Sequence, residues 1–194
     1  MEETIRNRLL AGAALYREMA DSMAEPTARA AQLITEAFRG GHRLYVCGNG
    51  GSAGQAQHIA GEMVGRFLRE RPALPCVALT TDTSILTAIA NDYAADQVFS
   101  RQVEAHMRPG DVLWAITTSG NSPNVLRAAE AARARGAKVL GMTGRAGGKL
   151  KALADLTLCV PADATPAIQE GHEALLHLLC GLVEEALFGP PEKR

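Results

Sequence analysis

Five short apolar runs alternate with helical segments from Arg43 onward, and this alternation constrains the fold more than any other feature of the chain. The runs have the composition of buried strands and fall at residues 43–47, 76–80, 112–116, 138–142 and 156–160. The helical segments span about 52–69, 84–91, 123–135, 148–154 and 167–187. Strands that alternate with helices predict a parallel sheet covered on both faces, which is a three-layer α/β sandwich.

The first 40 residues are rich in Ala, Arg and Glu and show helical periodicity. The pattern is broken near Glu25-Pro26, because a proline inside a helix removes a hydrogen bond and clashes with the preceding turn. Two helices are therefore predicted over residues 1–40, followed by an α/β core over 41–188. A chain of 194 residues is long enough for one domain with a substantial core.

Charge and composition argue against several kinds of partner. The chain carries 20 Lys and Arg against 21 Asp and Glu, it has no basic block, and only 4% of its residues are aromatic. Nucleic acid and anionic membrane are therefore not expected as partners. The acidic N-terminus does not predict a secretion signal, no apolar run is long enough to span a membrane, and a cytoplasmic protein is expected. The Pro190–Arg194 tail is expected to be frayed.

Four cysteines are scattered along the chain without C-x-x-C spacing. Three lie in strand-like runs and one in a helical segment: Cys47, Cys76, Cys159 and Cys180. Buried free thiols in a reducing cytosol are the expected state of these residues.

A cluster of hydroxyl residues follows the strand-like run at 112–116. Four hydroxyls surround Gly120 in this loop, those of Thr117, Thr118, Ser119 and Ser122. Ser122 fits the N-cap of the next helix and Pro123 fits its first position. Free backbone N–H groups, the helix dipole and the hydroxyls together predict a phosphate site that contains no lysine. In sheets of this kind, ligands bind beyond the carboxyl ends of the strands, where this loop lies.

A second loop of this kind follows the first strand. Gly48-Asn49-Gly50-Gly51-Ser52-Ala53 satisfies the pattern G-x-G-x-x-[GA], and Asp82 could serve as a ribose-binding acid, so a dinucleotide site is one interpretation. Asp82 lies about thirty residues further on, whereas that motif places its acid about twenty residues on. The two loops together favour a sugar phosphate.

Helical spacing places two pairs of possible ligands on common faces. His58 and Glu62 are i and i+4, a spacing that can hold a divalent metal or form an ordinary surface pair. Gln169 and His177 are i and i+8 on the last helix, again on one face.

Other polar residues allow two interpretations. Asn91 and Asp92 can simply end a helix, or they can bind substrate hydroxyls, and spacing alone does not decide between these roles. His172 lies off the face shared by the ligand pair on the last helix and is expected to be structural or exposed to solvent. His42 and His106 are expected at the surface.

Taken in order along the chain, these motifs resemble those of the phosphoheptose isomerases, which are sedoheptulose 7-phosphate isomerases of the sugar-isomerase (SIS) domain superfamily. The resemblance extends from about residue 5 to residue 188. It is carried by Cys47–Ser52, Gln57–Glu62, Thr80–Asp82, Ala90–Asp92, Thr118–Asn124 and Ile168–Glu170 with His177.

The resemblance implies a single SIS domain over residues 1–194 with a five-stranded, flavodoxin-like parallel sheet. It also implies a homotetramer with active sites at subunit interfaces and with the segment 1–40 packed at the oligomer interface. The implied reaction is an aldose–ketose isomerisation of sedoheptulose 7-phosphate to D-glycero-D-manno-heptose 7-phosphate through an enediol. This is the first step towards the nucleotide-activated heptoses of lipopolysaccharide or other surface glycans.

The resemblance also implies roles for individual residues. The implied phosphate ligands are Ser52, Thr117, Thr118, Ser119 and Ser122. The residues implied to contact the sugar are Asn49, Gly50, Gly51, Asn91 and Asp92, together with Glu62 and Gln169. The implied ligands of one Zn²⁺ per subunit are His58, Glu62, Gln169 and His177.

Two positions depart from the family pattern. Gln55 stands where many relatives carry Asp, one turn before His58, which bears on any proton relay through that carboxylate. Thr117 replaces a usual Ser, which keeps the hydroxyl and adds a methyl group.

The reaction needs a proton moved between C1 and C2 and stabilisation of charge on the carbonyl oxygen. Glu62 and His177 match the proposed base and acid of the family. Glu62 is predicted to shuttle the carbon-bound proton, and His177, with zinc, to polarise the oxygens or move protons between them. If both residues also ligate zinc, these roles need a rearrangement during turnover.

Two other classes of function stay open. One is a non-catalytic SIS-domain adaptor that binds the replication initiator protein, although an adaptor does not need the complete set of implied zinc ligands. The other is a sugar-phosphate sensor, which is disfavoured because no helix-turn-helix module is apparent. A different phosphosugar reaction is a further alternative.

Overall fold

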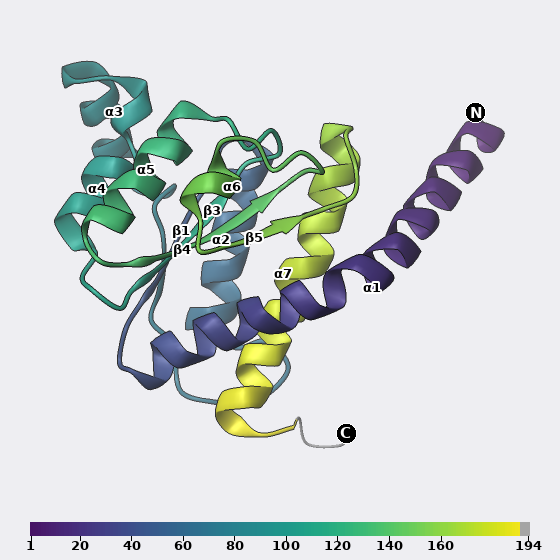
Figure 1. Cartoon of the computed structure of the whole chain (residues 1–194), viewed down its shortest axis with the longest axis horizontal. Coiled ribbons are helices and arrows are strands. Elements are labelled where there is room, and N and C mark those ends of the chain that lie inside the picture. Colours follow the sequence, from purple (N-terminus) through teal and green to yellow (C-terminus); the bar gives the residue numbers. More distant parts are fainter. Residues whose placement is uncertain (191–194) are drawn as a thin grey trace.

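A five-stranded parallel sheet forms the centre of the computed structural model, which describes residues 1–190 (Figure 1). Its strands are β1 (Leu44–Cys47), β2 (Cys76–Ala78), β3 (Val112–Ile116), β4 (Lys138–Thr143) and β5 (Leu156–Cys159). Their spatial order is β2-β1-β3-β4-β5, which is the order of a flavodoxin-like sheet. The predicted strands agree with the observed ones to within two residues, and the predicted α/β sandwich is confirmed.

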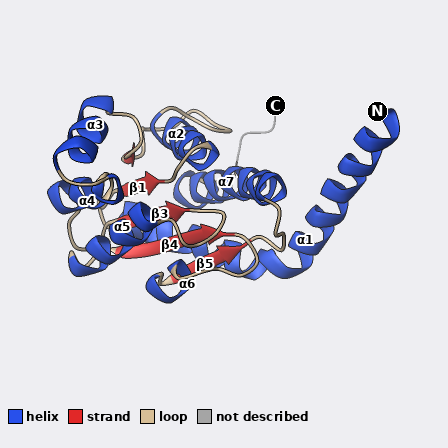
Figure 2. Ribbon diagram, turned by 90° about the horizontal axis from the view of Figure 1, so that it is seen from above, coloured by secondary structure: helices blue, strands red, loops and turns tan. Residues whose placement is uncertain are grey.

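Helices cover both faces of the sheet. They are α1 (Glu2–Arg39), α2 (Gly51–Val64), α3 (Thr83–Asp92), the 3₁₀-helix η1 (Ala95–Gln97), α4 (Ser100–His106), α5 (Pro123–Ala134), α6 (Leu150–Leu153) and α7 (Thr165–Phe188). Successive strand residues point to opposite faces, so the sheet contributes to two apolar cores. Leu44 and Val46 join the core beneath α1, α2 and α7, whereas Tyr45 and Cys47 join the core beneath α3, α4, α5 and α6. Figure 2 shows these two groups of helices on opposite sides of the sheet.

The N-terminal segment is one continuous helix, so the predicted break at Glu25-Pro26 is wrong. Pro26 lies inside α1. Buried residues continue on both sides of it at helical spacing, and we attribute the continuity to the packing of this face across α7, which outweighs the hydrogen bond that proline removes. These residues include Leu15, Met19, Met23, Thr27, Ala30, Ala31 and Ile34. The first part of α1 projects beyond the rest of the chain (Figure 1).

α2 ends at Val64, well before the predicted end at residue 69, and the reason is tertiary. The guanidinium of Arg71 donates to the carbonyl of Glu62 at 2.6 Å and so satisfies an acceptor in the last turn of the helix. The N–H of Leu68 donates to the carboxylate of Glu184 on α7 at 2.8 Å instead of continuing the helix.

The sheet register brings the two predicted ligand loops together. Cys47, the last residue of β1, pairs with Ala115 near the end of β3. The loops that follow these neighbouring strands therefore leave the same edge of the sheet side by side. The loop after β4 lies next to them, because Ile116 of β3 pairs with Met142 of β4.

The cysteines and the membrane prediction can be compared with the described residues. All four cysteines are free, as predicted; Cys47, Cys76 and Cys180 are buried as predicted, whereas Cys159 is partly exposed. Burial raises the pKa of both the Cys47 and the Cys180 thiols to about 12, so these thiols stay protonated. Within residues 1–190, every helix is too short or too polar to cross a bilayer.

Candidate functional site

The loop after β1 allows α7 to approach the start of α2 closely. Gly50 has a φ of 53°, a left-handed conformation that glycine adopts without strain. A Cβ at Gly51 would lie only 2.5 Å from Nε2 of Gln169, so a glycine there leaves room for that side chain. The loop thereby places Asn49, Gly50, Gly51 and the buried Ser52 around the N-terminus of α2.

Three hydroxyls of the loop after β3 contact one another. Thr117 Oγ1 lies 2.8 Å from Ser122 Oγ and 3.4 Å from Ser119 Oγ. Ser122 is the N-cap residue of α5 and Pro123 begins the helix, as predicted, but the Ser122 hydroxyl contacts Thr117 and does not cap the helix. The first turn of α5 is thus able to take another acceptor, such as a phosphate oxygen.

Side-chain amides join the two loops into one unit. Asn49 Nδ2 donates to Asn124 Oδ1 at 2.9 Å, and Asn124 Nδ2 donates back to Asn49 Oδ1 at 2.8 Å. On the other side, the N–H of Gly144 in the loop after β4 donates to the carbonyl of Thr118 at 3.0 Å. The predicted phosphate loops therefore form one candidate site. Asn124 was not predicted to take part, because its partner lies 75 residues away in the sequence.

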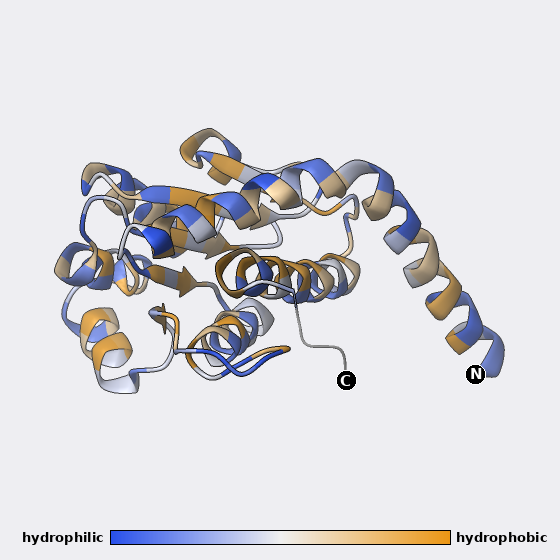
Figure 3. Ribbon diagram, turned by 90° about the horizontal axis from the view of Figure 1, so that it is seen from below, coloured by the Kyte–Doolittle hydropathy of each residue, from blue (hydrophilic) through white to orange (hydrophobic). Residues whose placement is uncertain are grey.

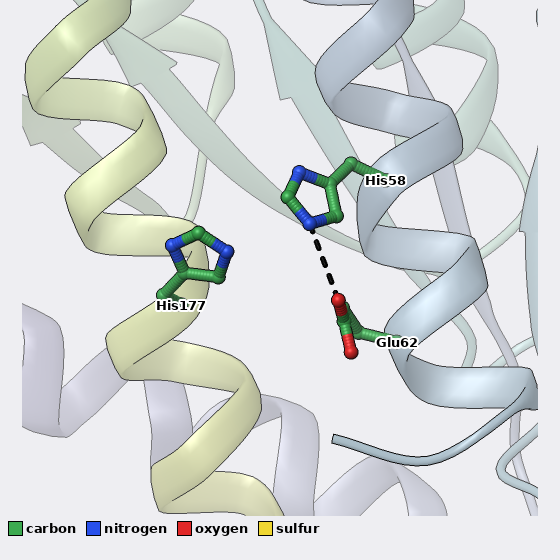
Figure 4. Close-up of side chains that lie close together, drawn as sticks. All are labelled: His58, Glu62 and His177. Carbon is green, nitrogen blue, oxygen red and sulfur yellow. Dashed lines mark hydrogen bonds and ion pairs between the residues drawn. The ribbon is translucent and has the colours of Figure 1, made fainter. Parts of the chain in front are cut away.

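His58, Glu62 and His177 converge between α2 and α7 (Figure 4). One ligand atom from each of the three lies within 4.8 Å of the others. Nε2 of His58 is 3.2 Å from Oε1 of Glu62, and the rings of His58 and His177 meet edge to face with centroids 4.9 Å apart. Phe67 stacks on His177 with an interplanar angle of 6° and so helps to orient it. Three of the four predicted metal ligands thus form one group.

Gln169, the fourth predicted ligand, lies beside this group. It shares a shallow groove with Gly51 and His58 at the start of α2. Its carbonyl accepts a hydrogen bond from Nε2 of Gln55 at 2.9 Å, which ties the two helices together.

Glu173 belongs to this site although it was not predicted. Its Oε1 lies 2.7 Å from Nδ1 of His58, and its Oε2 accepts from Nε2 of Gln55 at 3.3 Å. A signal for it does exist in the sequence, because Glu173 lies four residues after Gln169 and four before His177, on the same helical face.

The surroundings of His58 fit a bound cation. Each of its ring nitrogens faces a carboxylate, Nδ1 that of Glu173 and Nε2 that of Glu62. A neutral imidazole has only one N–H, so one nitrogen presents a lone pair to a carboxylate unless a proton or a metal ion lies between them. Nitrogen and oxygen donors of this kind suit a divalent metal.

Asn91, Asp92 and Asp82 lie at the two ends of α3, across the sheet from the histidines. Asn91 Nδ2 donates to Asp92 Oδ1 at 2.8 Å, and both residues are exposed at the end of the helix. Their role toward a substrate stays a prediction. Asp82 caps α3: its carboxylate accepts a hydrogen bond from the N–H of Ile85 at 2.9 Å. This capping role explains the presence of Asp82 without a ribose ligand, which the dinucleotide interpretation would need.

The remaining histidines lie apart from the candidate metal-binding group of His58, Glu62 and His177. His172 is fully buried on α7, with Nε2 3.1 Å from the carbonyl of Thr143, which confirms a structural role. Burial lowers its pKa to about 4, outweighing the opposing effect of this hydrogen bond. His106 is exposed, as predicted, and His42 is half-buried against Gly110.

Comparison with known proteins identifies the domain family of the chain. A family model described as "SIS domain" matches residues 10–144, which is more than half of the chain. Among solved structures, that of phosphoheptose isomerase GmhA from Neisseria gonorrhoeae is similar with a TM-score of 0.90 and 44% identity, covering 95% of this chain and 98% of that one.

Curated relatives then narrow the class. The phosphoheptose isomerase of Rhodospirillum rubrum is 54% identical over 187 residues, which cover 96% of this chain and 99% of that protein. The phosphoheptose isomerase of Trichlorobacter lovleyi is 50% identical over 189 residues, with 97% and 96% covered. The chain therefore belongs to the phosphoheptose isomerase family of SIS-domain proteins.

Proposed function

We infer that this protein is an aldose–ketose isomerase that converts sedoheptulose 7-phosphate to D-glycero-D-manno-heptose 7-phosphate, the first step towards nucleotide-activated heptoses. The observation that carries this conclusion is the 50% and 54% identity, over nearly the whole chain, to phosphoheptose isomerases. These relatives lend no support to an adaptor or a sensor. Solved structures below 25% identity, such as that of the NanR protein of Vibrio vulnificus at 16%, share the fold alone.

The spacing of the site suits a long sugar phosphate. The phosphate would bind between the loops after β1 and β3, through hydroxyls and the first turn of α5. His58 comes seven residues after Gly51, the first residue of α2, which is about 10 Å along the helix axis. A heptose carries its phosphate and its reacting carbons at opposite ends, so phosphate binding would direct C1 and C2 towards the metal-binding group and supply remote binding energy.

Glu62 and His177 are the proposed base and acid. A carboxylate has two oxygens; Oε1 of Glu62 faces His58, which leaves Oε2 to take the proton from one carbon and return it to the next through the enediol. His177, oriented by Phe67, would move the second proton between the two substrate oxygens.

We propose that His58, Glu62, Gln169 and His177 would hold one Zn²⁺ per subunit. Zinc takes nitrogen and oxygen ligands in catalytic sites, and a neutral amide among them makes the site weaker than a structural thiolate site. When bound, the ion would supply polarisation of the substrate oxygens.

A homotetramer with shared active sites and a cytoplasmic location complete the proposal. Large apolar side chains are exposed on the first part of α1: Ile5 is 53%, Leu9 71% and Leu10 60% exposed. Figure 3 shows hydrophobic residues, coloured orange, along this projecting part of the helix. Such a surface favours packing of the segment 1–40 against other copies of the chain, with the α/β core over 41–188 carrying the chemistry. The four free cysteines support a reducing compartment.

NMR of the purified protein with sedoheptulose 7-phosphate tests the activity, with added Zn²⁺ and again after chelation. Signals of aldoheptose 7-phosphate are expected, with their loss on chelation. Glu62→Gln should lower turnover by about 10²–10⁴-fold without changing the circular dichroism spectrum. Absence of conversion in both conditions, with phosphosugar binding intact, would contradict the isomerase and favour the adaptor. Substantial turnover by Glu62→Gln would remove Glu62 from the role of base.

A further inference from the structure

We propose that Glu173 is the positioning residue of His58: its carboxylate, held by Gln55, accepts the Nδ1 proton of His58 and so turns the Nε2 lone pair towards the metal-binding group. This inference rests on the proposed metal site. It assigns Glu173 a role that neither the loop motifs nor the predicted ligand set contains.

The contact between Oε1 of Glu173 and Nδ1 of His58 is a short ion-pair contact. Its length is 2.7 Å, the range of hydrogen bonds that involve an ionised partner. The two side chains are 40% and 36% exposed, so water only partly competes with the contact. Nε2 of the same ring, at 3.2 Å from Glu62 Oε1, is left as the free donor atom for a metal.

Gln55 fixes the carboxylate from the other side. The residue is only 7% exposed, and its Nε2 donates both to the carbonyl of Gln169 and to Oε2 of Glu173. Turning the amide over would place its oxygen against these two acceptors, so its orientation is determined. The amide therefore holds Glu173 in place but supplies no negative charge of its own.

Position 55 itself carries no charge in this chain. It lies one turn before His58 on α2, the position at which the resemblance implies an aspartate in many relatives. In this chain the residue there is neutral, and the carboxylate that lies against the imidazole comes from Glu173 on the facing helix.

Such a carboxylate has a measurable effect on metal affinity. Removing the hydrogen-bond partner of a metal-binding histidine typically costs about 10–100-fold in affinity, because the partner orients the ring and raises its basicity. The contribution of Glu173 can thus be measured with the metal alone, without substrate.

Calorimetric titration of the metal-free, full-length protein with Zn²⁺ tests the proposal. Glu173→Ala should weaken zinc binding by about 10–100-fold. Glu170→Ala removes an exposed carboxylate one turn earlier on the same helix and serves as the control. It should change the zinc affinity by less than about threefold if the affinity depends on the position of the carboxylate and not on the total charge. Adding Gln55→Asp to Glu173→Ala should restore most of the lost affinity, since residues 55 and 58 share a helical face. A Glu173→Ala protein that binds zinc like the parent, or no recovery in the double variant, would overturn the proposal.

A second readout separates this inference from the metal site itself. In the metal-free protein at pH 8, the ¹⁵N shifts of the His58 ring should show the proton on Nδ1 in the parent. In Glu173→Ala the proton should move towards Nε2, because Glu62 becomes its remaining carboxylate partner. If the parent binds no zinc but the ring shifts still differ between the parent and Glu173→Ala, the proposed metal site is wrong and the role of Glu173 towards His58 stands. An unchanged ring would reject the role.

Discussion

At the scale of single residues, the same amino-acid type serves different purposes according to its surroundings. His58 and His177 are partly exposed and converge with Glu62. His172, on the same helix as His177, is instead buried and hydrogen-bonded to the backbone of β4. Burial lowers the pKa of His172 to about 4, so the buried ring stays neutral at the pH of the cell.

This buried histidine should make stability depend on pH. Its pKa is lowered to about 4 in the folded chain from an ordinary 6.5, so between these values the unfolded state binds a proton that the folded state does not. The unfolding free energy should therefore fall by up to about 3 kcal/mol as the pH drops from 6.5 to 4. Urea titrations at fixed protein concentration between pH 4 and 8 measure this loss. His172→Gln, which keeps a donor for the Thr143 carbonyl, should have a flatter profile, and equal profiles would contradict the assignment.

At the scale of elements, local sequence patterns predicted the strands and loops, which depend on neighbouring residues. They did not predict the helix ends and contacts that depend on residues distant in the sequence. The five strands and the two ligand loops were located because their apolar runs and glycine and hydroxyl clusters are local signals. The break at Pro26 and the overlong α2 were errors, because α7 stabilises the first helix and Arg71 and Glu184 end the second. The short helices α4 and η1 were not predicted. Glu173 shares a helical face with Gln169 and His177, but its contact with His58 joins two helices that are distant in the sequence, and this contact could not be predicted locally.

The carboxylate of Glu184 should stabilise the segment that follows α2 and so contribute to the free energy of unfolding. This carboxylate is buried, pairs with Nε of Arg71 at 3.0 Å and accepts the N–H groups of Phe67 and Leu68. Glu184→Ala would leave a buried guanidinium without its charge partner, at a cost of about 3–5 kcal/mol. Denaturant unfolding measures the loss, with the exposed neighbour Glu185→Ala as a control expected within about 0.5 kcal/mol of the parent. A loss below 1 kcal/mol would show that the pair contributes little to stability.

At the scale of the whole molecule, the single helix α1 both packs on the core and exposes an apolar surface. From Leu15 onward its buried side chains pack across α7 and cover one face of the sheet, whereas the residues before Leu15 are largely exposed and include large apolar side chains. A helix whose apolar surface continues past the edge of its own core fits an assembly that covers it.

The proposed tetramer predicts how the mass in solution responds to a charge on this surface. The parent chain should sediment as four copies, and replacing Leu9 and Leu10, which are 71% and 60% exposed, with Glu should shift the mass to smaller species. Analytical ultracentrifugation measures both proteins. Ala11→Glu, an exposed neighbour on α1, is a control for added charge alone. A parent mass of one or two chains would reject the tetramer and, with it, active sites shared by four subunits.

The loops joined by Asn49 and Asn124 have one further consequence, for how the protein captures its ligand. Their hydroxyl and amide groups neither gain nor lose protons at physiological pH. The pH dependence of capture should therefore follow the second ionisation of the phosphate itself, near pH 6. Because local dipoles, and not a charged surface, attract the anion, salt should slow the encounter only weakly. At pH values above the second ionisation of the phosphate, the affinity of the loops for the substrate should therefore change little with pH or ionic strength.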